Sequence, residues 1–334
     1  MFKVVLTYPF GETPIEEEVL SKIDAKLFQI PCKTEDEVIA AARDADAALC
    51  GLEPFTKKVI ESLNQCKIIS NAGVGVDNID VESATKNGVI VAYVPDYCVD
   101  EVSDHALALL LACARRLIII NNAVKTGLDS DPAKKTDVIR PIHRLQTQTV
   151  GVVGLGRIGK ALARKAKGLG LRVVGYDPYP SGDMADGLGI ELVNLERLIE
   201  ESDFVSLHTP LTQETHHMFT IDHFKKMKRT AYFINTSRGA VVDEEALLKA
   251  LTMGYIAGAG IDVTEVEPLS PDNPILKLDN VIITPHMAAY SEESIAYMRR
   301  RYAEEVTRVL SGDWPINTVN PEVKENFAKR WDRR

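Results

Sequence analysis

The sequence contains no long hydrophobic run. Its longest uninterrupted apolar stretch is residues 106–114, and Arg115 and Arg116 follow it directly. A helix that crosses a bilayer needs about 20 apolar residues, so no membrane-spanning segment is expected. The first ten residues hold one lysine and no small-residue cleavage site, which argues against a signal peptide.

The chain is also short of positive charge and of cysteine. Its 39 Lys and Arg residues are outnumbered by 48 Asp and Glu residues, giving a net charge of −9. An acidic surface repels phosphate backbones, so broad nucleic-acid binding is not expected. The five cysteines form no CxxC pair, and an odd, scattered set is typical of reduced thiols in a cytoplasm. His208, His216 and His217 lack a metal-ligand spacing, so no metal is expected.

What is present is the composition of a folded protein. With 334 residues, 45% of them hydrophobic, the chain is expected to form about two domains. In the first hundred residues, apolar segments alternate with helical ones, which predicts βαβ units and a parallel sheet. The expected strands are residues 4–8, 47–50, 67–70 and 89–93, and the expected helices are 16–22, 34–42, 56–64 and 80–86.

A glycine-containing turn follows the expected strand 67–70. Gly73, Val74 and Gly75 lie beyond the carboxyl end of that strand, where open α/β sheets bind ligands. Glycines there allow backbone N–H groups to approach an anion such as a carboxylate. A tight turn that simply needs glycine explains the same residues equally well.

A boundary between domains is expected after residue 100. Residues 101 to about 125 form an apolar stretch that predicts one long helix, which is also suited to a subunit interface. The polar residues 126–147 that follow are expected to be irregular.

The motif GLGRIG lies between an apolar strand and an amphipathic helix. Gly154 permits the tight turn, Gly156 the close approach of a pyrophosphate, and Gly159 the packing of helix on strand. Arg157 and Ile158 open the helix, whose N-terminus faces the phosphates. The motif in this setting predicts a dinucleotide site.

The next expected strand is residues 172–176, and it ends in Asp177. This is near the spacing of about 20 residues typical of the acid that binds the adenosine ribose. Its carboxylate would repel a 2′-phosphate, and Pro178 and Tyr179 follow in place of a basic residue. The sequence therefore favours NAD over NADP as the cofactor.

The later expected strands are also followed by polar and charged residues suited to catalysis. In a parallel sheet these ends share the edge that holds the glycine turn, so a guanidinium, a carboxylate and an imidazole are expected to converge. The residues are His208-Thr209-Pro210 after strand 204–207, Thr236-Ser237-Arg238 after 231–235, Asp262 after 257–261, and Pro285-His286 after 281–284.

This set suits hydride transfer between a nicotinamide and a hydroxy acid. Arg238 can bind a carboxylate and stabilise charge on the carbonyl oxygen. His286 can donate the proton that completes the alcohol. Glu267 is the candidate partner that orients the imidazole, although Glu265 lies close to it in the sequence. The nicotinamide supplies the hydride, so no metal is needed.

On these motifs the chain resembles the D-isomer-specific 2-hydroxyacid dehydrogenase family over nearly its whole length. The resemblance rests on GLGRIG, on NTSRG at 235–239, on GIDVTEVEP at 260–268 and on TPHMAAYS at 284–291. Residues 94–112 and 286–294 are most similar to the C-terminal-binding-protein branch of that family, which includes dehydrogenase-like bacterial members and animal corepressors.

The resemblance implies an α/β fold of two Rossmann- or flavodoxin-like parallel-sheet domains with a cleft between them, as in formate and glycerate dehydrogenases. Residues 1–100 with 291–334 would be the substrate-binding domain, and residues 101–290 the NAD-binding domain. The helix 292–310 would pack on the first domain. A homodimer through the NAD domain is also implied.

The resemblance further implies roles for single residues. Arg238, Glu267 and His286 would be catalytic, Asp262 would hold the nicotinamide carboxamide, and the amides of Gly73, Val74 and Gly75 would bind the substrate carboxylate with Arg238 and His286. The remaining implied NAD contacts are Ser103, His208, Thr209, Pro210, Thr236, Ser237, Arg238 and His286.

Two residues depart from relatives within the family. Ala289 stands where the animal corepressors have tryptophan, so a differently shaped pocket is expected. Glu53 lies in the loop where phosphoglycerate dehydrogenases place arginines, which argues against a phosphorylated substrate. The main hypothesis is an NAD-dependent enzyme that interconverts 2-oxo and D-2-hydroxy acids. Phosphoglycerate oxidation and an NAD(H)-sensing interaction protein are the alternatives.

Overall fold

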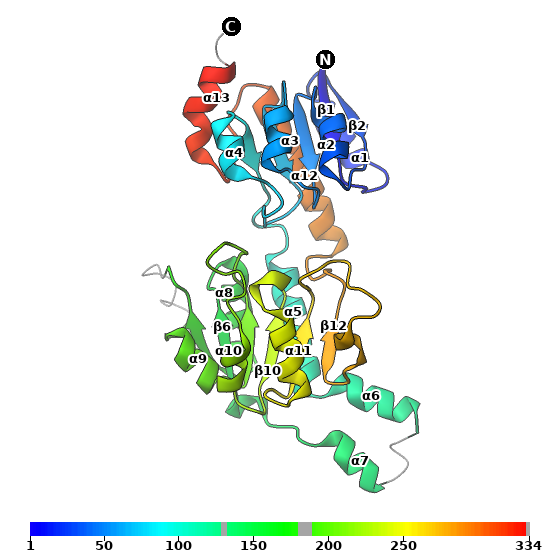
Figure 1. The fold of residues 1–334 in the computed structure, drawn as a ribbon, viewed down its shortest axis with the longest axis vertical. Coiled ribbons are helices and arrows are strands. Elements are labelled where there is room, and N and C mark those ends of the chain that lie inside the picture. Colours follow the sequence, from blue (N-terminus) through cyan, green and yellow to red (C-terminus); the bar gives the residue numbers. More distant parts are fainter. Residues whose placement is uncertain (128–131, 180–188, 332–334) are drawn as a thin grey trace. The chain divides into compact units, whose positions relative to one another are not determined.

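The computed structural model describes residues 1–127, 132–179 and 189–331. The chain divides into two compact units (Figure 1), Met1–Tyr97 with Ser291–Arg334 (unit 1) and Cys98–Tyr290 (unit 2). Each unit is a parallel β-sheet covered by helices, which confirms the expected fold class.

The sheet of unit 1 has the strand order β2-β1-β3-β4-β5, and every neighbouring pair is parallel. Its strands are β1 (Phe2–Leu6), β2 (Ala25–Gln29), β3 (Ala47–Cys50), β4 (Ile68–Asn71) and β5 (Ile90–Ala92). Its helices are α1 (Pro14–Leu20), α2 (Glu35–Ala42), α3 (Lys57–Ser62), α4 (Val81–Lys86), α12 (Glu292–Leu310) and α13 (Lys324–Trp331), with the 3-10 helix η5 (Pro321–Val323).

The sequence had not indicated strand β2. It forms one edge of the sheet, and its residues are partly or fully exposed. An edge strand of this kind lacks the continuous apolar run that marks a strand buried on both faces.

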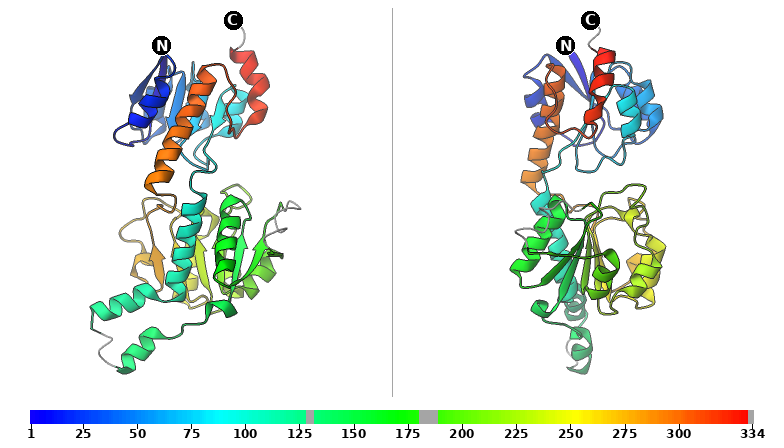
Figure 2. Two further views of the ribbon diagram at one scale, coloured as in Figure 1. Left: turned by 180° about the vertical axis from the view of Figure 1, so that it is seen from behind. Right: turned by 90° about the vertical axis from the view of Figure 1, so that its left-hand side faces the viewer.

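Helix α12 returns the chain to unit 1 and packs on its sheet (Figure 2). Met298, Tyr302 and Val306 are buried among residues of the central strands, and Ser70 of β4 donates a hydrogen bond to the backbone oxygen of Tyr302 at 2.9 Å. The apolar stripe of the helix therefore completes the core of the unit.

A buried ion pair joins α12 to α1. Glu16 has no exposed surface, and its two carboxylate oxygens each lie 2.7 Å from a nitrogen of Arg299. The hydroxyl of Tyr302 donates to the same carboxylate at 2.6 Å. Removing one partner of such a pair leaves the other buried without compensation.

Glu16→Ala is therefore expected to lower the free energy of unfolding of unit 1 by about 3–5 kcal/mol. Both tryptophans, Trp314 and Trp331, belong to unit 1, so urea unfolding followed by tryptophan fluorescence reports on this unit alone. The matched control is Glu18→Ala, because Glu18 pairs with Arg300 between the same helices but in an exposed position. Equal shifts of the midpoint in both variants would contradict the expectation.

The sheet of unit 2 has the strand order β12-β11-β10-β9-β6-β7-β8 and is also parallel throughout. Its strands are β6 (Thr149–Val153), β7 (Arg172–Tyr176), β8 (Glu191–Leu192), β9 (Phe204–Leu207), β10 (Tyr232–Asn235), β11 (Gly258–Ile261) and β12 (Val281–Ile283). Its helices are α5 (Val99–Ala114), α6 (Leu117–Lys125), α7 (Pro132–Ile139), α8 (Arg157–Gly168), α9 (Leu195–Glu201), α10 (Ile221–Lys226) and α11 (Glu244–Thr252), with the 3-10 helices η2 (Leu145–Thr147), η3 (Gly239–Val241) and η4 (Pro274–Lys277).

The order of strands in unit 2 reverses beside β6. From β6 the chain proceeds outward to β7 and β8, then crosses back to β9 on the other side. Parallel α/β sheets bind ligands beyond the carboxyl ends of the strands at such a reversal. The ends of β6 and β9 are therefore where a ligand of this unit is expected.

The single helix expected from residue 101 to about 125 is wrong. Two helices, α5 and α6, meet at an angle of 58°, and Arg116 between them has a φ of 53°. A residue in this left-handed conformation ends a right-handed helix. Helix α7 in turn lies within the stretch expected to be irregular.

Among the described residues no single helix is long and apolar enough to span a membrane, although α5 and α6 together satisfy length and composition.

Candidate functional site

The glycine turn follows β6, and the space around its glycines differs from one to the next. At Gly154, whose φ is 92°, an added Cβ would lie 2.7 Å from the backbone oxygen of His208. At Gly159 it would lie 2.0 Å from the backbone oxygen of Gly154. At Gly156, the N-cap of α8, it would meet no atom within 4 Å. Two glycines thus permit close packing, and the space is left open at the helix N-terminus, where a pyrophosphate binds in such turns.

Two buried hydroxyls near these strand ends have no hydrogen-bond partner among the described residues. They belong to Thr209, which follows β9, and Thr236, which follows β10. The two residues are only 6% and 8% exposed. A buried hydroxyl without a partner costs free energy unless a ligand supplies one. These hydroxyls and the open helix terminus fit a dinucleotide bound across the strand ends.

Asp177 directly follows β7, and its carboxylate is fixed by backbone amides. One oxygen accepts from the amide of Leu155 at 2.8 Å, and the other from the amide of Tyr179 at 2.9 Å. The first bond connects the carboxylate to the glycine turn itself. The negative charge is therefore held beside the turn, as binding of an unphosphorylated ribose requires.

His208 lies beside Gly154 and is held by Ser206, with 2.9 Å between its Nε2 and the Ser206 hydroxyl. Burial lowers the pKa of His208 to about 4. The ring is therefore neutral at neutral pH and cannot balance the charge of a phosphate. Its role toward a cofactor would be packing and hydrogen bonding.

The turn that carries Arg238 is organised by Asn235, the last residue of β10. The buried amide oxygen of Asn235 accepts from the backbone and the hydroxyl of Ser237, at 3.0 and 2.8 Å, and its amide nitrogen donates to the backbone oxygen of Arg238 at 3.0 Å. Gly239 then packs against Thr264, where an added Cβ would lie 1.9 Å from the Thr264 oxygen. The chain at Arg238 is thus fixed directly against the turn that leads to Glu267.

His286 and Glu267 form a short hydrogen-bonded pair. The Nδ1 atom of His286 lies 2.6 Å from Oε2 of Glu267, while Oε1 of Glu267 accepts from the amide of Thr264 at 3.1 Å. Glu265 instead contacts His217, so the geometry selects Glu267 of the two candidates. Because Nδ1 is engaged, Nε2 of His286 is the atom available to donate a proton. Both side chains are about one-third exposed, which leaves the pair accessible to a substrate.

Asp262 directly follows β11 and accepts hydrogen bonds from the loop after β12. It is 2% exposed and accepts from the amides of Met287 and Ala288 at 3.0 and 2.8 Å, and from the hydroxyl of Thr284 at 2.5 Å. His105 of α5 adds a contact of 2.9 Å to Thr284. Asp262 thus holds the loop that carries His286, and its contact with a nicotinamide stays a prediction.

Sequence reasoning missed His105 and Thr284 because they are far apart in the chain. Neither a helical i, i+4 pattern nor a short sequence motif shows that a residue in a helix contacts a residue in a distant loop. Ser103, expected near the cofactor, donates to backbone oxygens of Val99 and Asp100 and accepts from Lys165 at 2.7 Å. Its contact with NAD also stays a prediction.

The turn after β4 in unit 1 offers unused amides. Among the described residues, the amides of Gly73, Val74 and Gly75 donate no hydrogen bond. The turn is held instead by Asn71, whose side chain donates to the Gly75 oxygen at 2.7 Å. Exposed amides of this kind suit an anion such as a carboxylate.

Comparisons with known proteins agree with this geometry. The family described as D-isomer specific 2-hydroxyacid dehydrogenase, NAD binding domain, matches residues 107–288. The glyoxylate reductase of Korarchaeum cryptofilum is 45% identical over 325 residues, which cover 94% of this chain and 96% of that protein. The D-3-phosphoglycerate dehydrogenase of Methanocaldococcus jannaschii is 38% identical over 96% of this chain, but this covers only 60% of its own length.

A solved structure of a dehydrogenase is also similar to this chain. The D-lactate dehydrogenase of Aquifex aeolicus, complexed with NAD and lactic acid, has a TM-score of 0.83 and 30% identity, and the match covers 95% of this chain and 98% of that one. These similarities do not distinguish the C-terminal-binding-protein branch, which stays a prediction. The matched family, the glycine turn and the Glu267–His286 pair place the chain in the D-isomer-specific 2-hydroxyacid dehydrogenase family, with NAD as its cofactor.

Proposed function

We propose that the protein uses NADH to reduce small 2-oxo acids, glyoxylate first among them, to 2-hydroxy acids. Membership of the family makes it an NAD-dependent oxidoreductase of 2-hydroxy acids. The observation that carries the proposal is the Glu267–His286 pair, because it leaves one imidazole nitrogen free to exchange a proton with the substrate oxygen. The choice of glyoxylate rests on similarity to glyoxylate reductases.

Each residue of the proposed site has a distinct task. NADH, when bound, supplies the hydride that reaches the substrate carbonyl carbon. His286 donates a proton from Nε2 to the carbonyl oxygen, and Glu267 holds the ring in the required orientation. Arg238 attracts the substrate carboxylate and stabilises the charge on the oxygen before the proton arrives. In unit 1, the amides of Gly73–Gly75 offer hydrogen-bond donors suited to a carboxylate.

A phosphorylated substrate is disfavoured by Glu53. This residue follows β3 and is 5% exposed, with one oxygen accepting from the amide of Gly51 at 2.8 Å and from the hydroxyl of Thr7 at 3.2 Å. A fixed carboxylate at the end of β3 opposes a phosphate there. Phosphoglycerate oxidation therefore remains the secondary candidate.

We also propose a homodimer formed through unit 2. Helix α6 has a single buried residue, Ala123, whereas Leu117, Ile118 and Val124 are exposed. An apolar helix face without cover favours association with another surface. A second copy of the chain, as the family resemblance implies, is the proposed partner. The reduced thiols expected from the sequence suit a cytoplasmic protein, and all five cysteines are buried and outside any disulfide.

The test is NADH oxidation, followed at the absorbance band of the cofactor, against glyoxylate, hydroxypyruvate, pyruvate, bulkier 2-oxo acids and 3-phosphohydroxypyruvate. Turnover is expected with the small unphosphorylated acids. Preference for the phosphorylated acid would overturn the substrate assignment. NADH binding without turnover of any acid would favour the NAD(H)-sensing alternative.

Cofactor choice is expected to depend on the charge of Asp177. Wild-type protein should prefer NADH over NADPH, because a carboxylate beside the ribose repels a 2′-phosphate. Asp177→Asn keeps a hydrogen-bond acceptor for the Leu155 amide but removes the charge. In this variant, the ratio of kcat/KM with NADH to kcat/KM with NADPH is expected to fall about tenfold, equivalent to about 1.4 kcal/mol. An unchanged ratio would remove Asp177 from cofactor selection.

A further inference from the structure

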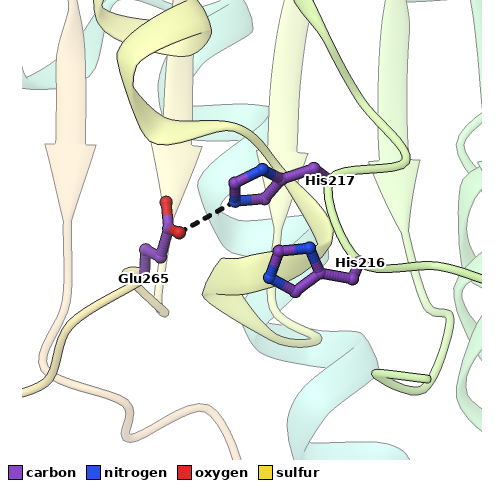
Figure 3. A group of neighbouring side chains, drawn as sticks. All are labelled: His216, His217 and Glu265. Carbon is purple, nitrogen blue, oxygen red and sulfur yellow. Dashed lines mark hydrogen bonds and ion pairs between the residues drawn. The ribbon is translucent and has the colours of Figure 1, made fainter. Parts of the chain in front are cut away.

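A cluster of potential metal ligands lies apart from the Glu267–His286 pair. His216 and His217 are in the segment between β9 and α10, and Glu265 is in the turn after β11 (Figure 3). One ligand atom from each of the three residues lies within 4.8 Å of the others. The sequence did not reveal the cluster, because its third member comes from a distant part of the chain.

The two histidines are held in place by their backbones. The amide of His216 donates to the oxygen of Thr212 at 2.9 Å, and that of His217 to the oxygen of Ala240 at 2.8 Å. Their rings stack with centroids 4.1 Å apart and an angle of 25° between the planes. Stacked rings on a fixed backbone present nitrogens to the same side, as Figure 3 shows.

Glu265 completes the set with a carboxylate. Its Oε1 lies 2.8 Å from Nε2 of His217, and its backbone amide donates to Glu244 at 3.0 Å. The Glu244 carboxylate adds a second negative charge beside the turn. Among the described residues the ring of His216 makes no hydrogen bond, so its ligand atoms are not committed elsewhere.

We propose that His216, His217 and Glu265 bind a divalent transition-metal ion, with Zn²⁺ as the best match. Two imidazoles and one carboxylate are an established donor set for zinc, with an open fourth position for water. Bonds of about 2.0–2.2 Å place tetrahedral ligand atoms roughly 3.3 Å apart, so small side-chain rotations suffice to accept the ion. Ca²⁺ and Mg²⁺ are disfavoured because they prefer oxygen ligands.

The site shares its turn with the catalytic carboxylate. Glu265 is two residues before Glu267, and the Thr264 amide between the strand and Glu265 donates to Glu267. His217 is bonded to Ala240, two residues after Arg238. A bound ion therefore connects the segment beside Arg238 to the turn that carries Glu267. Its expected role is to fix that turn, while the chemistry of reduction proceeds without it.

The experiment titrates the full-length, metal-free protein with Co²⁺, whose visible absorption reports ligand geometry, and with Zn²⁺ by calorimetry. One ion per chain is expected. His216→Ala and Glu265→Gln should each weaken binding at least about tenfold, since each removes one of three ligands. His143→Ala is the matched control, because His143 is exposed and outside the cluster, and should bind as the wild type does.

Two further readouts separate a metal site from a simple ion pair. Zn²⁺ should raise the midpoint of thermal unfolding in the wild type and leave it unchanged in His216→Ala. Metal-free His216→Ala should keep wild-type turnover, because its ring has no contact with the reacting groups. The absence of Co²⁺ and Zn²⁺ binding, or equal affinity in His216→Ala and the wild type, would overturn the proposal and leave His217–Glu265 as a structural pair.

Discussion

Replacing His286 with alanine is expected to lower kcat for 2-oxo acid reduction by about 10²–10⁴-fold, the usual contribution of a general acid. The Nδ1 atom of His286 lies 2.6 Å from the Glu267 carboxylate. The backbone amide of His286 donates to the backbone oxygen of Asp262 at 2.7 Å. NADH affinity should change little, because the glycine turn and Asp177 are unaffected. Steady-state kinetics and NADH fluorescence titration measure the two effects.

The partner of His286 gives a graded second variant. Glu267→Gln keeps a side chain able to accept from the ring nitrogen but removes the negative charge, so a smaller loss of kcat is expected than in His286→Ala. His143→Ala changes an exposed histidine between α7 and η2, serves as the control and should keep full turnover. Wild-type kcat in His286→Ala would remove this residue from the mechanism, whatever Glu267→Gln does.

Much of the fold was predictable because parallel strands buried on both faces leave a simple signal. Strands β3, β7 and β9 were expected at the bounds that the structure has, and each is a short apolar run after a helix. Helix α2 was expected at residues 34–42, and in the structure a capping box of Thr34 and Glu37 begins it. Local patterns of this kind do not depend on distant parts of the chain.

The features that the sequence did not predict leave no such local signal. The bend at Arg116 lies at a residue in the left-handed conformation, and hydrophobic periodicity is the same for one long helix and two short ones. The contacts from His105 to Thr284 and from His217 to Glu265 join residues that only the fold brings together. In the site, motifs at strand ends predicted that Arg238 and His286 lie at one edge of the sheet, because parallel strands align their ends. The choice of Glu267 over Glu265 rested on the family resemblance, and the structure pairs Glu267 with His286.

Arg238→Gln is expected to lower kcat/KM for 2-oxo acids by about 10²–10³-fold, as for the loss of one donor that stabilises an oxyanion. The guanidinium carries the charge that complements both the substrate carboxylate and the developing alkoxide. The backbone at this position is held by Asn235 and by the packing of Gly239 on Thr264. The substitution therefore removes the charge and the guanidinium's hydrogen bond to the Ser237 backbone oxygen. It keeps the contacts that Asn235 and Gly239 make in the turn.

Arg238→Lys distinguishes charge from geometry. Lysine keeps the positive charge but not the planar fork that binds a carboxylate through two parallel hydrogen bonds. An intermediate kcat/KM is expected, with most of the loss in KM for the acid and NADH affinity unchanged. The exposed Arg229→Lys provides a matched conservative control. If Arg238→Lys equals the wild type, position-specific recognition by the guanidinium is wrong and only its charge matters. If Arg238→Gln also keeps wild-type kcat/KM, the reduction must draw its charge stabilisation from another group.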